Sequence, residues 1–408
     1  MSRKSTTVKW IMRFDAARCC QLMFMTFVFS ISCASAIAQD QIATDSIRKA
    51  PKGFIGSLFR YAEKTVFQYI DKTSSQKNNK PFIFSIIGAP FYTNETKVGL
   101  EMVGSGLFRL KGCENDSLPS DVSLFLNATT SGAYAVGITS DLYFPEMKSW
   151  FNISFSFNDT PLQYWGVGYE AGQKNEYTNY NMQQAQFVVS YFRRIDKDLS
   201  AGITFEANDM RGKYIDDISF LHGEKRKITA MGAGFNLVYD SRDVITDPYK
   251  GMYININNIF YPNYMGSIPN VNNLNFIFRY YKRVTKSTVL AFDFDSELNF
   301  GKVPWGLMAL TGNSNEMRGY YSGRYRDKKL IDAQVELRQH IYKRSGVVVW
   351  AGAGNVLREF SKLKMKETLP TVGFGYRFRL KERINLRLDY GFGRQGQSAF
   401  YINLNEAF

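Results

Sequence analysis

The sequence contains few of the residues that build disulfides or zinc sites, with 4 cysteines and 2 histidines among 408 residues. Only Cys113 follows residue 38, and the other three cysteines lie in an N-terminal segment that we expect to be removed: Cys19, Cys20 and Cys33. The mature chain can therefore form no internal disulfide. The two histidines, His222 and His340, are isolated, so no Cys/His cluster predicts a metal site. We expect no metal and no cofactor.

Long apolar runs and catalytic motifs are also missing. After Gln39 no run approaches the ~20 apolar residues that a membrane-spanning helix requires. The sequence has neither a G-x-S-x-G nucleophile motif nor a phosphate-binding glycine loop. Asp293, Asp295 and Glu297 come nearest to an acid–base group, but they share one strand face without a candidate cleft, and hydration explains them. We therefore predict neither an enzyme nor a small-molecule substrate.

Positive charge is in excess but is not concentrated. The formal net charge is +14; the first 38 residues hold five Lys and Arg and one Asp, which makes +4 and leaves +10 for the rest. No basic helix or basic-aromatic platform occurs, so nucleic acid is not an expected partner. Anionic lipid headgroups are the expected partner of a positive surface that is spread in this way.

Residues 1–38 have the parts of a secretion signal: a basic start, an apolar stretch and an A-x-A cleavage site at 36–38, before Gln39. A lipoprotein signal at Cys33 is the alternative, but the preceding tripeptide SIS fits that signal poorly. We therefore predict an exported protein.

Residues 39–80 form a second segment, which is too short for a folded periplasmic domain. Within it, apolar residues recur every fourth position from Phe54 to Ile70, and this spacing predicts an amphipathic helix. Such a helix fits the periplasmic mouth of a barrel, its lumen or a partner protein; an ordinary linker helix is the alternative.

From Pro81 onward the hydrophobic period is two. In the stretch from Ile384 to Phe392, apolar residues alternate with polar, charged or glycine residues, and 372–379 shows the same pattern. A soluble β-sandwich also alternates in this way. Signal-directed export, paired charges on the polar face and an aromatic-rich apolar face, in a chain with 33 Phe and 25 Tyr, favour a transmembrane barrel instead.

The pattern predicts sixteen strands, an even number as a bacterial barrel requires. They are Pro81 to Tyr92, Lys97 to Leu110, Asp121 to Thr130, Tyr134 to Phe144, Trp150 to Asn158, Gln184 to Ile195, Leu199 to Asn208, Lys227 to Asp240, Gly251 to Tyr261, Asn273 to Val284, Ser287 to Phe300, Leu330 to Tyr342, Gly346 to Val356, Leu369 to Leu380, Glu382 to Gly393 and Ser398 to Phe408. Short turns alternate with long loops. The predicted fold is thus all-β: a closed antiparallel 16-stranded barrel over residues 81–408, in the outer membrane of a Gram-negative bacterium, with its N-terminus in the periplasm.

The sixth outward loop carries the most distinctive motif, Met317-Arg318-Gly319-Tyr320. A guanidinium can hold a carboxylate by two parallel hydrogen bonds, and a glycine permits a tight or left-handed backbone. Alternation places Glu336 on the polar face of the next strand, so we predict that this loop folds inward and that Arg318 pairs with Glu336. The alternative is a hydrated, charged lumen in which Arg318 has no fixed partner.

These features resemble the BamA/TamA superfamily of outer-membrane barrels, also called the bacterial surface antigen family. The family's sixth loop bears a (V/I)RG(F/Y) motif, and Glu336 follows it here in V-E-L-R. A periplasmic turn of the form D-x-R-D…P-x-x-G is matched by Asp240, Arg242, Asp243, Pro248 and Gly251. We interpret that turn as structural. The alternating C-terminal strand, which ends on an aromatic residue, is similar to the recognition signal of outer-membrane substrates: Phe400, Ile402, Leu404 and Phe408.

The resemblance implies a barrel that helps to insert, assemble or export envelope proteins, as an accessory in a larger complex. It also implies a weak seam between the first and last strands that opens laterally, and a short first strand would weaken it. Two departures stand out. Gly352 occupies the position of a usual aspartate, for which Asp389 or the pair Asp293 and Asp295 are candidate replacements, and the polypeptide-transport-associated repeats are absent from the sequence. A sealed scaffold subunit, or a passive pore, therefore remains as an alternative function.

Overall fold

The computed structural model describes residues 82–113 and 119–408. The expected signal at 1–38 and the segment at 39–80, with its expected helix from Phe54 to Ile70, lie outside the described residues. Among the residues that are described, no helix is long and apolar enough to span a membrane.

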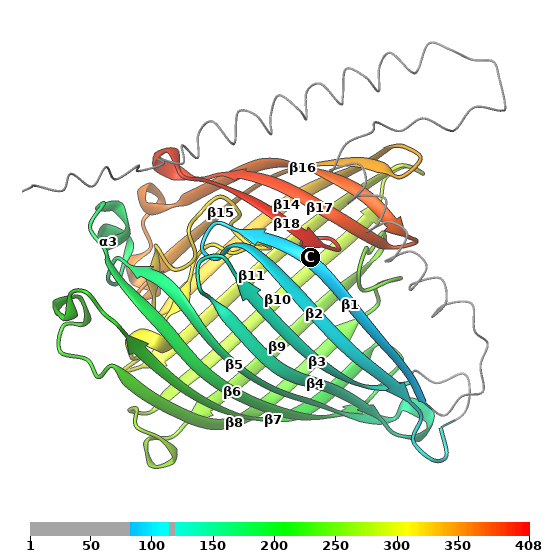
Figure 1. The fold of residues 1–408 in the computed structure, drawn as a ribbon, viewed down its shortest axis with the longest axis horizontal. Helices are drawn as coiled ribbons and strands as arrows, with labels where there is room; N and C mark the ends of the chain where they lie inside the picture. The colour runs from blue at the N-terminus through cyan, green and yellow to red at the C-terminus, as the bar shows by residue number, and fades with distance from the viewer. Residues whose placement is uncertain (1–81, 114–118) are drawn as a thin grey trace, which may run out of the picture. The chain divides into compact units, whose positions relative to one another are not determined.

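Sixteen antiparallel strands close into a barrel in the described part of the chain, which confirms the predicted fold class (Figure 1). The strands are β1 (Phe82–Thr93), β2 (Lys97–Phe108), β3 (Ser120–Thr129), β4 (Tyr134–Tyr143), β5 (Ser149–Tyr164), β6 (Thr178–Arg194), β7 (Leu199–Lys213), β8 (Lys227–Asp240), β9 (Gly251–Tyr261), β10 (Val271–Arg283), β11 (Thr288–Gly301), β14 (Lys329–Tyr342), β15 (Ser345–Leu357), β16 (Leu369–Lys381), β17 (Ile384–Phe392) and β18 (Ser398–Leu404).

The remaining elements belong to the connections. β12 (Ala309–Leu310) pairs with β13 (Arg326–Asp327) in a separate two-stranded sheet, and α3 (Tyr169–Gln173) is a short helix after β5. The 3-10 helices are η1 (Pro145–Met147), η2 (Ile218–Leu221), η3 (Asn263–Met265), η4 (Trp305–Leu307), η5 (Phe360–Lys362), η6 (Met365–Glu367) and η7 (Arg394–Gly396). We call the end of the barrel with the long connections the loop end and the opposite end the turn end.

Three strands extend well beyond their predicted boundaries. β5 continues to Tyr164, β6 begins at Thr178 and β7 continues to Lys213, so the predicted loop at 159–183 is shorter than expected. The extra residues mix Asn, Gln, Asp and Thr with a few apolar ones, such as Leu162, Tyr164 and Tyr180, and their backbones stay paired as far as Tyr164 and Thr178. Backbone hydrogen bonds continue the ladder where the sequence is too polar to predict a lipid-facing strand.

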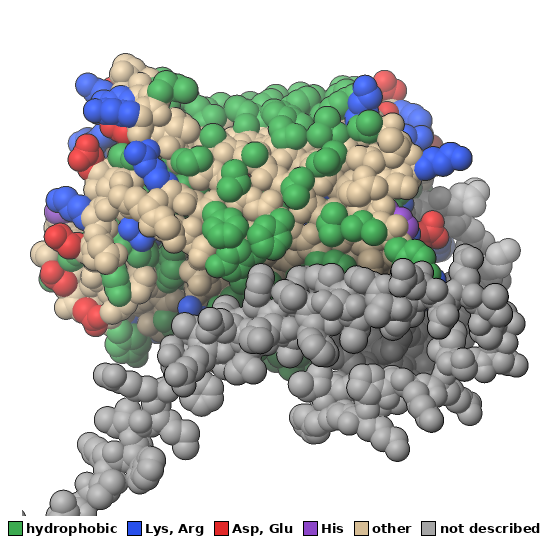
Figure 2. Space-filling model, turned by 90° about the horizontal axis from the view of Figure 1, so that it is seen from above, with side chains coloured by type: hydrophobic (Ala, Val, Ile, Leu, Met, Phe, Trp, Pro, Cys, Tyr) green, Lys and Arg blue, Asp and Glu red, His purple; other side chains and the backbone are tan. Residues whose placement is uncertain are grey.

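The two faces of the wall differ as the alternation predicts. On β14 the carboxylate of Glu336 is buried, whereas the neighbouring Val335 and Leu337 are 44% and 40% exposed. Figure 2 shows hydrophobic side chains spread over the middle of the wall, with Lys, Arg, Asp and Glu gathered at its two ends. The apolar side chains therefore face outward, toward lipid, and the polar ones fill the lumen.

The last strand ends earlier than predicted. β18 stops at Leu404, so the expectation of a strand that runs to Phe408 is wrong. Asn405 has a φ of 64°, a left-handed conformation that asparagine adopts more readily than most residues, and it turns the chain out of the wall. Phe408 lies inside the barrel, with its ring centroid 6.4 Å from that of Tyr281 on β10.

β1 and β18 meet at the seam of the barrel (Figure 1). One residue pair, Tyr92 with Ile402, joins the two described strands, whereas twelve pairs join β1 to β2. β1 has 12 residues and β18 has 7. We expected the first strand to be the short one at the seam, but the short strand is the last one. The seam is weak because β18 leaves the wall at Leu404.

Candidate functional site

Loop six, residues 302–328 between β11 and β14, enters the lumen. Its two arms are held together by the β12–β13 pairing and by a hydrogen bond of 2.9 Å from Thr311 N to Tyr325 O. Between them, Met317 has a φ of 49° and the side chain of Arg318 is completely buried. The loop thus carries a charged side chain from the loop end into the interior of the barrel.

The structure brings Arg318 together with two carboxylates on the barrel wall. Arg318 Nη2 lies 2.6 Å from Glu336 Oε2 on β14, and Nη1 lies 2.7 Å from Asp389 Oδ2 on β17. The guanidinium carbon is 3.6 Å from the centroid of the Trp350 ring on β15, a cation–π contact. One planar cation therefore links three strands of the wall.

Six buried side chains of alternating charge form a closed ring in the lumen, which we call the charge ring: Arg318, Glu336, Arg338, Glu406, Arg377 and Asp389. Five of its neighbouring pairs have N···O distances from 2.5 to 2.8 Å, and the pair Arg338–Glu406 has 3.7 Å. Three cations and three anions balance within the ring. Burial of each charge is compensated by two neighbours of opposite sign, so loss of one member leaves each of its two neighbours with a single ring partner.

The glycine and tyrosine of the motif bring the loop backbone against β16 to β18. Gly319 has a φ of 111°, and a Cβ at this position would lie 2.7 Å from the backbone nitrogen of Phe392. Its own N–H donates to the Tyr401 hydroxyl at 3.1 Å. The buried Tyr320 hydroxyl donates to the carbonyl of Pro370 and accepts from Arg394 N at 2.8 Å. A residue larger than glycine at 319 would push the loop away from the wall.

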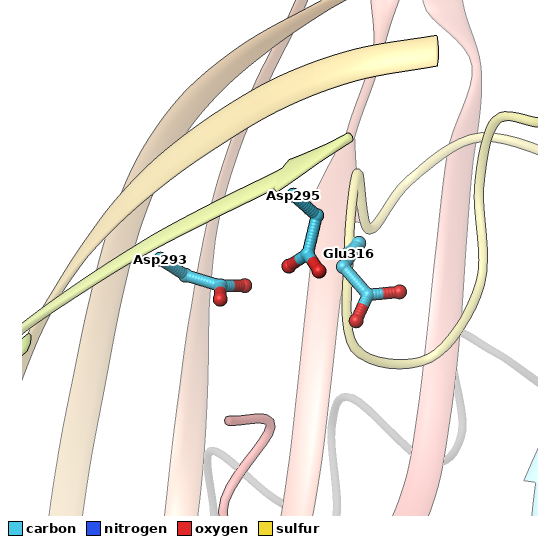
Figure 3. Close-up of side chains that lie close together, drawn as sticks. All are labelled: Asp293, Asp295 and Glu316. Atoms are coloured by element: carbon cyan, nitrogen blue, oxygen red, sulfur yellow. The ribbon is translucent and has the colours of Figure 1, made fainter. Parts of the chain in front are cut away.

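Asp293 and Asp295 do not contact Arg318. Both lie on β11 beside Glu316 of loop six, as Figure 3 shows, and these three acids surround Arg279 of β10. Arg279 Nε is 2.8 Å from Asp293 Oδ1, while its Nη2 is 3.7 Å from Asp295 and 3.4 Å from Glu316. This cluster ties loop six to β10 and β11, the strands next to β14 of the charge ring.

Gly352 stands where the resemblance suggested an aspartate. A Cβ at this position would lie 2.7 Å from the carbonyl oxygen of Ala333, so the close strand pairing leaves no room for a side chain. Of the candidate replacements, it is Asp389 that supplies the second carboxylate to Arg318. The acid comes from β17 instead of β15.

The turn between β8 and β9 holds the residues of the second motif. Asp240 accepts two hydrogen bonds from the Arg242 guanidinium, at 2.9 and 2.7 Å. Asp243 accepts from Tyr249 N at 2.9 Å and from Arg383 Nη2, in the β16–β17 turn, at 2.8 Å. Pro248 is buried. Gly251 has a φ of 104°, and a Cβ at this position would lie 2.2 Å from the carbonyl oxygen of Ser241. The motif therefore shapes this turn and connects it across the turn end to β16 and β17.

The proposed C-terminal signal is divided by the structure. Phe400, Ile402 and Leu404 lie on β18. The Phe400 ring lies 5.9 Å from that of Tyr92 across the seam. Phe408 instead lies in the lumen, where its carbonyl oxygen accepts from Arg338 Nη2 at 2.8 Å.

Several residues of the site were not anticipated from the sequence. Arg377 and Arg338 lie on the polar faces that alternation marks, but alternation does not identify their partners. Glu406 was placed in the last strand, and only its position after the left-handed Asn405 brings it to Arg377, at 2.7 Å. The contact of Trp350 with Arg318 was not predicted, because alternation does not identify which residue of loop six meets a given wall residue.

Comparison with known proteins places this geometry in a family. Residues 121–408 match the Omp85 superfamily domain. BamA from Haemophilus ducreyi, in a form lacking POTRA domains 1-3, is similar in structure, with a TM-score of 0.56 and 12% identity over 81% of this chain and 71% of that chain. CdiB from Acinetobacter baumannii has a TM-score of 0.54 and 11% identity over 81% of this chain and 60% of its own. At these identities the solved structures show a shared fold. No curated protein has a sequence that matches this chain.

Proposed function

Because the chain belongs to the Omp85 superfamily, as an outer-membrane β-barrel with this fold, we propose that it helps to insert, assemble or export other envelope proteins as part of a larger complex. Its partners are outer-membrane lipids and other envelope proteins, and its turn end faces the periplasm. Residues 1–38 act as the signal and 39–80 as a periplasmic segment before the barrel at 81–408. No catalytic step is required.

The seam between β1 and β18 carries the proposal. Among the described residues one pair, Tyr92 and Ile402, closes it, so β18 leaves most of the 12 residues of β1 without a strand partner on this side. A strand edge with unpaired N–H and C=O groups can accept an added strand from another protein. A client strand would pair with β1 while the wall opens at the seam.

Loop six supports this opening because it holds both sides of the seam. On one side Gly319 and Tyr320 contact β17, β18 and the residues between them. On the other side Ser322 N donates to Glu95 Oε1, in the turn between β1 and β2, at 2.8 Å. Loop six stays in place and fixes the positions of the two strand edges while the strands separate. The charge ring therefore acts as the anchor of a lateral gate.

A disulfide across the seam tests the proposal. In a Cys113→Ser background, Tyr92→Cys with Ile402→Cys places thiols on the one paired position of β1 and β18. Leu100→Cys with Ala128→Cys, paired within β2 and β3, is the matched control. We expect the oxidised seam variant to lose its ability to promote folding of a urea-denatured outer-membrane barrel protein into liposomes, and to regain it with dithiothreitol. The oxidised control should remain active. Full activity of the locked seam would refute lateral opening.

A sealed scaffold subunit is the second candidate, favoured by the plugged lumen. Loop six and the charge ring occupy the interior, and the β8–β9 turn bridges to Arg383 at the turn end. Deletion of residues 39–80 distinguishes the two functions. Loss of partner co-purification while the barrel still assembles supports a scaffold. Conductance in planar bilayers only after removal of loop six would argue against a passive pore in the intact protein.

A further inference from the structure

A cavity of about 370 Å³ lies at the turn end, next to the charge ring. Its wall is formed by β10, β11 and β14 to β17 together with the β8–β9 turn. The lining is rich in cations: Arg283, Lys286, Arg338, Arg344, Arg377 and Arg379. Two carboxylates, Asp247 and Glu406, line the same cavity, and Glu336 and Asp389 pair with Arg338 and Arg377 from the ring, which leaves a formal excess of +2 with His340 neutral.

The arginines of this cavity are not fully satisfied by the protein. Arg338 and Arg377 are 6% and 5% exposed, yet Arg338 Nη1 and Arg377 Nη2 have no hydrogen-bond partner among the described residues. Arg379 Nε is likewise buried without a partner there. A buried guanidinium N–H without an acceptor is costly, and native proteins rarely keep several in one place.

The Glu406 carboxylate is already engaged. Glu406 accepts from Arg377 Nε at 2.7 Å and from Asn385 Nδ2 at 2.8 Å. The other acids of the charge ring face the ring and not the cavity. These three N–H groups, which have no partner among the described residues, and the excess positive charge together favour an anionic acceptor from outside the chain.

We infer that this cavity binds a phosphate group. Several N–H donors from planar guanidinium groups suit the oxygens of a phosphate, and arginine binds this group better than lysine does. A single carboxylate would leave half of the excess positive charge uncompensated. The phosphate can belong to a free phosphate compound or to a lipid headgroup, which share the same chemistry. The inference does not depend on the proposed function, because it rests on the cavity alone.

Calorimetric titration of the full chain in a maltoside detergent tests the site, with inorganic phosphate as one probe and dibutanoyl phosphatidic acid as the other. The variant is Arg283→Gln with Arg379→Gln, since neither residue belongs to the charge ring. Arg211→Gln, an exposed arginine at the loop end, is the matched control. Heat-modifiable migration on gels verifies that each variant is a folded barrel.

We expect saturable binding with one site per chain that the double variant weakens by at least about tenfold, as the loss of charge-assisted hydrogen bonds predicts. The Arg211→Gln protein should bind like the parent. Binding of both probes indicates that the phosphate group is sufficient, and binding of the lipid alone identifies a headgroup site. Binding of neither probe, or equal binding by the parent and the folded double variant, would overturn the inference.

Discussion

Arg318 and Asp389, 71 residues apart in the sequence, form an ion pair of 2.7 Å inside the barrel with both side chains completely buried. The pair joins a loop that starts at the loop end to the middle of a wall strand. Since both charges are removed from water, each depends on the other and on the rest of the charge ring. The position of loop six thus depends on a small number of electrostatic contacts.

Removal of one acid from the charge ring should destabilise the barrel. We expect Asp389→Asn to lower the free energy of unfolding by about 3–5 kcal/mol, because it leaves Arg318 and Arg377 with an excess of buried positive charge. Tryptophan fluorescence during urea unfolding in detergent micelles measures this change. Asp209→Asn is the control, since Asp209 pairs with Lys227 near the surface and should contribute no more than about 1 kcal/mol. Equal losses in the free energy of unfolding for the two substitutions would show that the charge ring stabilises the barrel no more than a surface ion pair does.

Loop six should also be sensitive to a single methyl group at Gly319. In Gly319→Ala, the added Cβ meets the backbone of Gly391 and Phe392, so we expect the loop to withdraw and become open to protease in intact cells. Gly132→Ala is a matched control because Gly132 also has a positive φ, 88°, but has open space around it. That substitution should cost only the backbone strain, about 1–2 kcal/mol, without exposing loop six. Protection of loop six in Gly319→Ala would contradict the close packing.

The β8–β9 turn predicts a dependence of stability on pH. Burial alone raises the pKa of Asp243, but hydrogen bonds from Tyr249 N–H and Arg383, together with the charge of Arg383, outweigh burial and hold the pKa below the usual 3.8. A lowered pKa in the folded state means that Asp243 stabilises the fold above pH 3.8 and that this contribution is lost as the pH falls through the lower value.

We therefore expect Asp243→Asn to be less stable than the parent at pH 7, with a difference that shrinks as the pH falls below about 3.8. Urea unfolding of both proteins at a series of pH values measures it. Asp196→Asn, an exposed acid in the β6–β7 turn, serves as the control and should show no such trend. A constant difference between Asp243→Asn and the parent at all pH values would exclude the ion pair with Arg383 as its cause.

The alternation of residues determined much of this protein. The period of two from Pro81 onward was sufficient to predict the strand number, because each strand must present an apolar face to lipid. The same alternation put Glu336 on the lumen side, and the polar motif around Arg318 predicted an inward loop. Where the chain becomes more polar, as around Pro161 and Gln183, the strand ends were misplaced because backbone pairing there continues without an apolar face toward lipid.

Only the tertiary structure decided which charges meet. Closure of the barrel brings β17 next to loop six, so Asp389 and not Asp293 or Asp295 becomes the second partner of Arg318. The left-handed Asn405 takes Glu406 and Phe408 out of the wall, which completes the charge ring and weakens the seam. Alternation acts between neighbours along one strand, whereas these contacts join residues across the lumen, and their distances exist only once the barrel is closed.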